Sequence, residues 1–494
     1  MEVILIAIYG LALTFIFCYS LIQLQLVWKY RQYRKQAEVE VPKTLGLDDL
    51  PQVCVQLPIF NEAYVAERLV DRICELGYPK DKLEIQVLDD STDETQALLQ
   101  AKVAAKKATG FEIYYLHRTD RSGFKAGALA AGLKQTKAEL IAIFDADFMP
   151  EPNFLTEMVP AFQDKEVGMV QSRWEHLNEG HSWLTKLQAF GLDAHFSVEQ
   201  GGRNAGGHFM NFNGTAGLWR KSCIEDAGGW QSDTLTEDLD LSYRAQLKGW
   251  KFKFLEKVGA PAELPAAMNA LKTQQFRWNK GAAECVRKNL GKVLRAEKIS
   301  FSTKLNAIFH LMNSAVFICI VILALLSIPM LMIKHHFAEY HFLFTLASVF
   351  IVSLPILAWF YWTSWQRIYT NRWKALSQFL LRFPFFLSVS MGLSLHNAWA
   401  VAEGYLGIKS PFLRTPKFAL SKNQQAQWVN NRYIKRKIGF LPFLELLFAA
   451  YFVFGIVLGI QYQDFGLLPF HFMLMIGFAY VSFLSFWHAL KTAS

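Results

Sequence analysis

Two carboxylates stand two residues apart at the end of a hydrophobic run in the stretch IAIFDADFMP (141–150). Residues 140–144 are typical of a short buried strand, which the Met-Pro pair that follows would end. Side chains two apart on a strand point to the same side, and at the carboxyl end of a parallel strand that side opens into a ligand crevice. Asp145 and Asp147 are therefore candidate oxygen ligands for Mg²⁺ or Mn²⁺, although a charged turn has the same pattern.

A second acidic group occurs in TLTEDLDLSYRAQLKGW (234–250). The pattern predicts a helix that starts at Thr236 and carries Glu237 and Asp238 in its first turn, where the helix dipole stabilises negative charge. Helix capping and acid–base chemistry both fit these residues, and the stretch alone does not separate them.

A cation and an aromatic side chain share one face of the helix predicted over 265–290, which begins at Pro265. Gln274, Arg277 and Trp278 lie three or four residues apart. An Arg beside a Trp binds diphosphate and stacks under a sugar, while an amphipathic helix on a membrane surface has the same pattern. The two interpretations are compatible.

The elements that must position these residues alternate between strand and helix. Strand-like runs near 52–58, 83–89, 112–118 and 140–144 are separated by helical patterns, which predicts an α/β domain with a parallel sheet. Neither the Walker nor the Rossmann glycine fingerprint occurs. A phosphate group in this crevice would therefore need a divalent cation and basic side chains.

The composition changes along the 494 residues. Hydrophobic residues make up 52% of the chain, and most of them lie outside the α/β region. Uncharged or nearly uncharged runs long enough to cross a ~30 Å hydrocarbon layer occur at 3–28, 307–333, 342–362, 441–460 and 465–487. We predict three regions: an N-terminal transmembrane helix (1–30), a water-facing domain (48–300) and a transmembrane channel region with about four spanning helices (301–494).

The net charge of +9 comes from basic clusters beside the apolar runs, at 28–36, 286–298 and 430–437, and does not indicate nucleic-acid binding. Such flanks are typical of the cytoplasmic side, so we expect the catalytic domain to be cytoplasmic and the N-terminus outside. Both flanks of residues 378–400 would then lie on the cytoplasmic side of the membrane, which favours an interfacial or re-entrant segment over a spanning helix. The six cysteines show no paired spacing and fit a reducing compartment.

Nine stretches in one order carry a family resemblance: VLDDSTD, GFKAGAL, FDADFMP, HFSVEQ, FNGTAGLWR, TEDLDL, KGWKF, AELP and QQFRW. They cover roughly residues 50–290. Together they resemble the membrane-embedded, inverting family 2 glycosyltransferases with a GT-A fold. Within that group they look most like the plant cellulose-synthase-like A and C (mannan and glucan synthase) proteins and their bacterial relatives.

The resemblance implies a donor site. Asp89 and Asp90 would contact the nucleobase and ribose, and Lys125 would lie near the nucleotide. Asp145 and Asp147 would bind the diphosphate through Mg²⁺ or Mn²⁺. The other nucleotide-sugar contacts that the resemblance implies come from the Q-x-x-R-W motif: Gln274, Arg277 and Trp278.

The resemblance also implies a reaction site and a gate. Asp238, next to Glu237, would take the proton from the acceptor hydroxyl, and the acceptor would meet Asn213, Gly214 and Trp278. Cellulose synthases carry a cysteine where this chain has Asn213, which puts cellulose as the product in doubt. SPFLRTPK (410–417) resembles a cytoplasmic gating loop (405–420) that closes over the nucleotide, although a basic juxtamembrane linker has a similar composition; its residues would be Phe412, Thr415 and Lys417.

The implied activity is an inverting β-glycosyltransferase of the cytoplasmic (inner) membrane, or of the Golgi membrane in a eukaryote. It would polymerise a β-glucan or β-mannan from UDP-glucose or GDP-mannose and translocate the growing chain across the bilayer. The alternative is a single transfer to a ceramide- or polyprenyl-type lipid. A transporter or scaffold that only binds nucleotide fits less well, because every acidic position is present. An oligomer or a separate export partner is compatible with the sequence.

Overall fold

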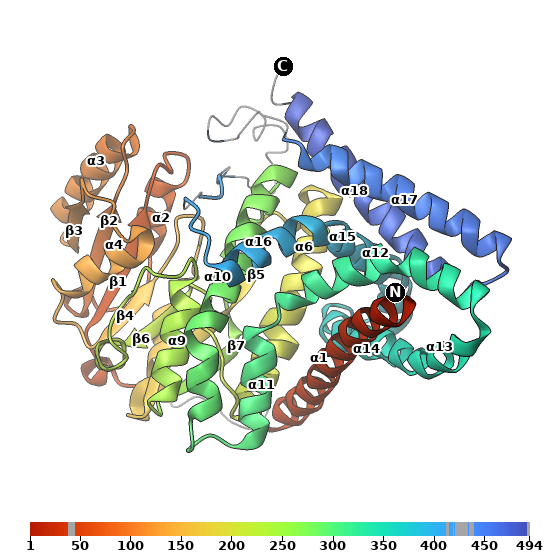
Figure 1. Cartoon of the computed structure of the whole chain (residues 1–494). Helices are drawn as coiled ribbons and strands as arrows, with labels where there is room; N and C mark the ends of the chain where they lie inside the picture. The colour runs from red at the N-terminus through yellow and green to blue at the C-terminus, as the bar shows by residue number, and fades with distance from the viewer. Residues whose placement is uncertain (38–44, 412–413, 418, 420–432, 434–438, 492–494) are drawn as a thin grey trace.

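The computed structural model describes residues 1–37, 45–411, 414–417, 419, 433 and 439–491. A β-sheet with its covering helices forms one part of the molecule, and long apolar helices form the other (Figure 1). Helix α10 (Met268–Arg295) lies between the two parts, packed along α16 (Ser394–Leu406). The sheet domain and the apolar helices thus lie side by side, with the helix that carries the Q-x-x-R-W motif at their junction.

The sheet has seven strands in the order β3-β2-β1-β4-β6-β5-β7. Strand β6 runs antiparallel to both β4 and β5, and the other strand pairs are parallel. The expected parallel sheet is therefore mixed, because the short stretch GLWR inserts between β4 and β5. The strands are β1 (Val53–Ile59), β2 (Leu83–Asp89), β3 (Glu112–His117), β4 (Leu140–Ile143), β5 (Val167–His176), β6 (Gly217–Arg220) and β7 (Lys251–Ala262).

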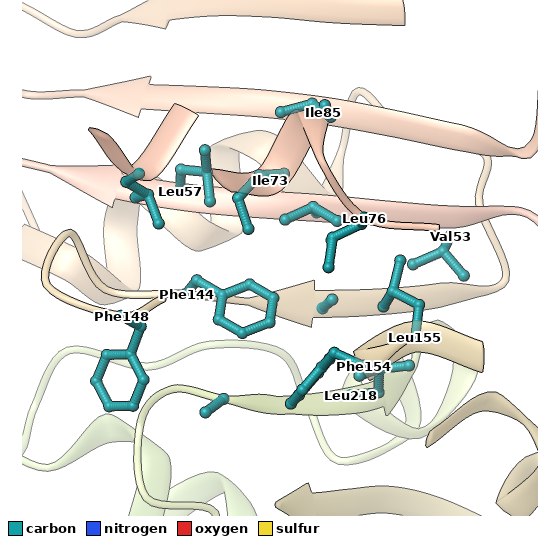
Figure 2. Close-up of a cluster of buried hydrophobic side chains, with 14 of the residues drawn as sticks. Val53, Leu57, Ile73, Leu76, Ile85, Phe144, Phe148, Phe154, Leu155 and Leu218 are labelled. Atoms are coloured by element: carbon teal, nitrogen blue, oxygen red, sulfur yellow. The ribbon is translucent and has the colours of Figure 1, made fainter. Parts of the chain in front are cut away.

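The sheet is held by burial of apolar side chains on both of its faces. Every residue of β1 and β2 is buried, as expected for continuous hydrophobic runs in parallel strands. Figure 2 shows one of these clusters, in which residues of the strands and of the segment after β4 meet residues of α5, of α2 and of the turn after α2: Val53, Leu57, Ile73, Leu76, Ile85, Phe144, Phe148, Phe154, Leu155 and Leu218. This rigid packing fixes the strand ends, from which the site residues project.

Helices cover the sheet and connect its strands. They are α2 (Ala66–Cys74), α3 (Thr95–Ala108), α4 (Phe124–Leu133), α5 (Phe154–Met158), α6 (Trp183–Ala194), α7 (Gln200–Gly206), α8 (Lys221–Asp226) and α9 (Glu237–Leu247). A π-helical turn, His195–Glu199, joins α6 to α7. Helix α9 starts at Glu237, one residue later than the sequence pattern predicts, and Thr236 occupies the N-cap position without a side-chain capping hydrogen bond.

The apolar part consists of α1 (Glu2–Ala37), α11 (Phe301–Leu311), α12 (Ala315–His336), α13 (His341–Ala347), α14 (Ser353–Trp365), α15 (Arg372–Gly392), α16, α17 (Leu441–Gln461) and α18 (Leu468–Lys491). Among the described residues, six helical segments are long and apolar enough to cross a membrane: Glu2–Arg34, Ala315–His336, Ala338–Ile368, Arg372–Gly392, Leu441–Gln461 and Leu468–Lys491. The run at 307–333 is divided between α11 and α12. Residues 378–400 fall on α15 and α16, which meet at Leu393, and their interfacial placement stays a prediction.

Polar contacts join the two parts of the molecule. Lys272 of α10 donates to both carboxylate oxygens of Glu445 in α17, at 2.7 and 2.9 Å, and to Ser485 of α18 at 3.0 Å. On the opposite side of the domain, Tyr30 of α1 donates to Glu256 of β7 at 2.7 Å. Because charged groups are costly to bury unpaired, these pairs fix how α10 and β7 sit against the apolar helices.

Candidate active site

A cavity opens where β1, β2, β4 and β5 end, at their carboxyl ends. All predicted site residues in the described part of the chain line it except Asp89: Asp90, Lys125, Asp145, Asp147, Asn213, Gly214, Glu237, Asp238, Gln274, Arg277, Trp278, Thr415 and Lys417. They come from seven separate segments of the chain. Phe412 lies outside the described residues.

Lys125 joins the DAD stretch to the loop that carries Gly214. Its ammonium donates to Asp145 Oδ1 at 2.6 Å and to the carbonyl oxygen of Gly214 at 2.7 Å. Although burial alone would raise it, the Lys125 and Arg414 charges hold the pKa of Asp145 below its ordinary value. Asp145 is therefore an anion at neutral pH, and its neighbour supplies a cation at the same place.

Asp147 has one oxygen in use and one without a partner. Oδ2 accepts a hydrogen bond from Lys417 at 2.7 Å, whereas Oδ1 is buried with no hydrogen-bond partner among the described residues. Such a buried acceptor carries a desolvation cost that a cation would remove, so this carboxylate fits a divalent ion. No cluster of three or more metal-ligating side chains occurs in the described ranges, so any such ion would draw its other ligands from the substrate and water.

Asp238 lies in the first turn of α9, at the base of the cavity. Burial, with the Glu237 carboxylate beside it, raises the pKa of Asp238 to about 7. A carboxylate with this pKa is suited to accept a proton near neutral pH. Gly214, at φ +81°, approaches so closely that a Cβ there would lie 3.0 Å from Asp238 Oδ2. Because residue 214 is a glycine, the loop before β6 can lie directly against the Asp238 carboxylate.

Helix α10 holds the loop that carries Asp238. Glu284 Oε2 accepts a hydrogen bond from the Leu235 backbone N–H at 2.7 Å. A Cβ on Gly281 would lie 2.5 Å from Thr236 Cγ2, so only glycine permits this approach. The base and the Q-x-x-R-W motif are therefore positioned by the same helix.

The two aspartates of the LDDS stretch have different positions. Asp90 lines the cavity and accepts two hydrogen bonds from Arg118, at 2.8 and 2.5 Å. Asp89 is fully buried beside the cavity, where it accepts from the Ser91 backbone at 2.9 Å and from Tyr115 at 2.7 Å. Asp89 thus shapes the loop on which Asp90 stands, and its contact with a nucleotide stays a prediction.

The segment at 414–417 closes one side of the cavity. Arg277 donates to Thr415 Oγ1 at 3.1 Å, and Arg414 pairs with Glu62 Oε2 at 2.6 Å. Together with Lys417 these contacts bring residues of the predicted gating loop over the strand ends. Among the described residues, the cavity therefore gathers five cationic side chains around its carboxylates: Arg121, Lys125, Arg277, Arg414 and Lys417.

Sequence reasoning missed several lining residues: Arg121, Trp174, Glu175, His176, Glu263 and Arg414. Residues 174–176 end strand β5, so the same strand-end argument that selected Asp145 could have found them. Arg414 lies inside the stretch that resembles a gating loop. For Arg121, whose guanidinium lies 3.3 Å from the Phe60 ring centre, the sequence offers no signal.

This architecture, a mixed seven-stranded sheet with a carboxylate-rich cavity at the strand ends, defines the GT-A class of transferases. The mannosyltransferase PcManGT from Pyrobaculum calidifontis, solved in complex with GDP-Man and Mn²⁺, matches 81% of this chain and 100% of its own, with a TM-score of 0.54 and 17% identity. At this identity the likeness concerns the fold alone.

The sequence comparisons agree with this class. Residues 51–281 match the family described as glycosyltransferase like family 2. Glucomannan 4-beta-mannosyltransferase 1 of Oryza sativa subsp. japonica is 38% identical over 314 residues, 60% of this chain and 60% of the relative. Glucomannan 4-beta-mannosyltransferase 2 of Arabidopsis thaliana is 40% identical over 295 residues, 58% of this chain and 55% of the relative. The match thus spans less than two thirds of either relative. Residues 51–281 are thus similar to family 2 glycosyltransferases, and this part of the chain is related to plant glucomannan mannosyltransferases, as the sequence motifs predict.

Proposed function

We propose that this protein is a membrane-embedded, inverting β-mannosyltransferase. It would extend a β-linked hexose polysaccharide from a nucleotide-sugar, with GDP-mannose as the preferred donor. The observation that carries the proposal is the convergence of Asp145, Asp147, Arg277 and Asp238 on one cavity. The names of the related plant enzymes favour mannose over glucose. The apolar helices and the basic flanks support a bilayer location with the catalytic domain on the cytoplasmic side.

The donor diphosphate would lie among the cations of the cavity. Lys125, Arg277 and Lys417 provide charge-assisted hydrogen bonds, and the guanidinium of Arg277 suits bidentate contact with phosphate oxygens. Asp145 and Asp147 would hold Mg²⁺ or Mn²⁺, which would screen the diphosphate and stabilise it as a leaving group. Asp90, at the edge of the cavity, would meet the nucleoside.

Asp238 would act as the general base. Its raised pKa makes the carboxylate basic enough to take the proton from an acceptor hydroxyl as that oxygen attacks the anomeric carbon. The C–O bond to the diphosphate breaks in the same step, and the nucleoside diphosphate leaves with the bond's electron pair. One displacement inverts the anomeric centre, so an α-linked donor yields a β-linkage. Trp278 would stack under the acceptor sugar at the mouth of the cavity.

The position of α10 supports a growing chain as the acceptor. This helix carries Trp278 and is bound through Lys272 to α17 and α18, so the acceptor side of the cavity adjoins the apolar helices. A polymer leaving the site would pass directly into that region. A lipid-linked acceptor would arrive from the same side, and the experiment below separates the two.

The test is a donor panel on protein purified into nanodiscs. GDP-mannose, UDP-glucose, UDP-N-acetylglucosamine and UDP-galactose are each supplied with Mn²⁺ or Mg²⁺, and release of nucleoside diphosphate is followed. The product is then sized and digested with linkage-specific hydrolases. We expect a long, β-mannanase-sensitive polymer from GDP-mannose. Turnover that requires added lipid acceptor and adds one sugar per lipid would contradict the polymerase proposal.

A further inference from the structure

A chain of polar contacts runs from the π-helical turn to the acceptor side of the cavity. His195 Nε2 lies 3.0 Å from Asn213 Nδ2, and His195 Nδ1 lies 2.9 Å from Glu199 Oε2. The other oxygen of Glu199 accepts from Arg203 at 3.0 Å. Asn213 lines the cavity, whereas Glu199 and Arg203 are buried behind it. Interior π-turns are rare and occur frequently at functional sites.

The contacts determine which ring nitrogen of His195 carries the proton. An amide nitrogen only donates, so Nε2 of His195 must accept from Asn213. The ring proton then sits on Nδ1 and points to the Glu199 carboxylate. Although burial alone would raise it, the hydrogen bond from His195 and the charge of Arg203 hold the pKa of Glu199 well below its ordinary value, so the partner of Nδ1–H is an anion.

The amide of Asn213 is consequently held at both atoms. Its Oδ1 accepts from Gln200 Nε2 at 2.7 Å, and its Nδ2 donates to His195. Its backbone N–H donates to Gln171 Oε1 at 3.0 Å. Among the contacts of the described residues, one N–H and one oxygen lone pair of this amide remain for a ligand, and their directions are fixed by His195 and Gln200.

We propose that His195 is a positioning residue for the acceptor: through Asn213 it presents an amide N–H and an amide oxygen to a hydroxyl of the terminal acceptor sugar. The inference rests on the proposed function, which places the acceptor at this side of the cavity. A fixed amide discriminates between hydroxyl orientations, because a sugar that cannot pair leaves buried polar groups unsatisfied. His195 thereby biases the outcome of donor turnover toward transfer and away from hydrolysis by water.

Two substitutions at one position test this inference. In His195→Gln the side-chain amide extends to about the place of Nε2 and can still accept from Asn213. In His195→Asn the amide ends at about the place of Nδ1, so the Glu199 contact is kept and the Asn213 contact is lost. Full-length protein in nanodiscs is supplied with GDP-mannose and Mn²⁺. The readouts are the ratio of mannose in polymer to free mannose and the KM for the donor.

We expect His195→Asn to lower the polymer-to-free-sugar ratio about tenfold, the scale of one hydrogen bond in a buried site, with the donor KM unchanged. His195→Gln should restore the ratio to within about threefold of wild type. His208→Ala, which removes another buried histidine that contacts Thr303 instead, should leave the ratio unchanged. Equal ratios in His195→Asn and wild type, or equal losses in the Asn and Gln variants, would overturn the inference.

A second variant keeps the test decisive if His195→Asn fails to fold. Gln200→Met removes the hydrogen bond to Asn213 Oδ1 without touching His195, and the same fall in the ratio is expected. An unchanged ratio there would overturn the inference. Failure of the proposed function is distinguishable, since wild-type protein would then release no nucleoside diphosphate or form no polymer.

Discussion

Lys417 Nζ donates to Asp147 Oδ2 at 2.7 Å, so a cation from the C-terminal half of the chain engages a carboxylate 270 residues earlier. Both side chains are largely buried. The second oxygen of Asp147 has no hydrogen-bond partner among the described residues. The ammonium and a divalent ion would therefore compete for the same carboxylate.

This competition predicts that Lys417→Met binds Mn²⁺ more tightly in the absence of donor. Loss of the ammonium leaves Asp147 as a buried charge without compensation, and the gain on binding a cation increases. We expect a fall in the Mn²⁺ dissociation constant of about tenfold, the scale of one charge-assisted hydrogen bond. Electron paramagnetic resonance of free Mn²⁺ measures it directly.

The controls for this experiment lie at the same contact. Lys417→Arg keeps a cation and should keep the wild-type affinity, whereas Asp147→Asn should lose Mn²⁺ binding and metal-dependent donor binding together. Removal of the metal with a chelator should abolish donor turnover in the wild type. An unchanged Mn²⁺ affinity in Lys417→Met would mean that the lysine does not compete with the ion.

The sequence was sufficient to predict the strand-end carboxylates because their position follows from local pattern. A hydrophobic run that ends in Asp145 and Asp147 predicts both a buried strand and the side of the sheet to which it opens. Asp238 follows from the start of a helix in the same way. The GT-A fold follows from the resemblance that nine ordered motifs carry, and the seven-stranded sheet and the likeness to a solved structure bear it out.

What the sequence could not predict depends on contacts between distant segments. Strand β6 has four residues, too few for a periodic signal, so the antiparallel insertion between β4 and β5 was missed. The π-turn at 195–199 looks like ordinary helix in the sequence. The pair of Lys272 and Glu445 joins residues 173 apart, and neither residue's surroundings indicate the other. Such contacts arise from packing, which single-sequence patterns do not encode.

The raised pKa of Asp238 predicts a pH dependence of transfer. A general base acts in its deprotonated form, so kcat/KM should rise with pH through about 7 and fall as pH drops below it. The Asp238→Asn variant should bind donor normally and reduce transfer by ~10²–10⁴-fold, the usual range for loss of a positioned base. Steady-state rates between pH 5 and 9, with isothermal titration of donor, check both points; wild-type turnover in Asp238→Asn would show that another group is the base.

Two glycines of α10 have different surroundings, so the same substitution to alanine should reduce transfer at one of them and leave it unchanged at the other. A Cβ on Gly281 would meet Thr236 at 2.5 Å, whereas a Cβ on Gly291 would have no atom within 4 Å. Gly281→Ala should therefore push the loop before Asp238 out of place and reduce transfer by about 10²-fold, the typical cost of a misplacement near 1 Å. Donor affinity should change less, because Lys125 and Lys417 lie on other segments and Arg277 lies one turn away on α10.

Gly291→Ala is the matched control, since it adds the same methyl group to the same helix in open space. It should leave transfer unchanged and raise helix stability by roughly 0.5–1 kcal/mol. Parallel measurement of kcat, donor affinity and unfolding temperature separates the two variants. If both alanines affected transfer equally, the close approach of α10 to the loop would not control the position of Asp238.

The buried pair of Lys272 and Glu445 predicts a non-additive effect on stability. The two side chains are 8% and 0% exposed, and the ammonium also donates to Ser485 at 3.0 Å. Removing one partner leaves the other as an uncompensated buried charge, at a cost of about 3–5 kcal/mol. Lys272→Met should therefore lower the unfolding temperature sharply. Because α10 would no longer be bound to α17 through this pair, donor turnover should be lost as well.

The double variant Lys272→Met/Glu445→Met removes both charges and keeps similar side-chain volumes. Replacement of a buried ion pair by apolar residues is often neutral or stabilising, so the double variant should unfold at or near the wild-type temperature. Thermal unfolding followed by tryptophan fluorescence in one detergent compares the two single variants with the double. If the losses in unfolding temperature were additive, each residue would act through separate contacts. If the double variant recovers the wild-type unfolding temperature, the two charges compensate one another at the junction of the sheet domain and the apolar helices.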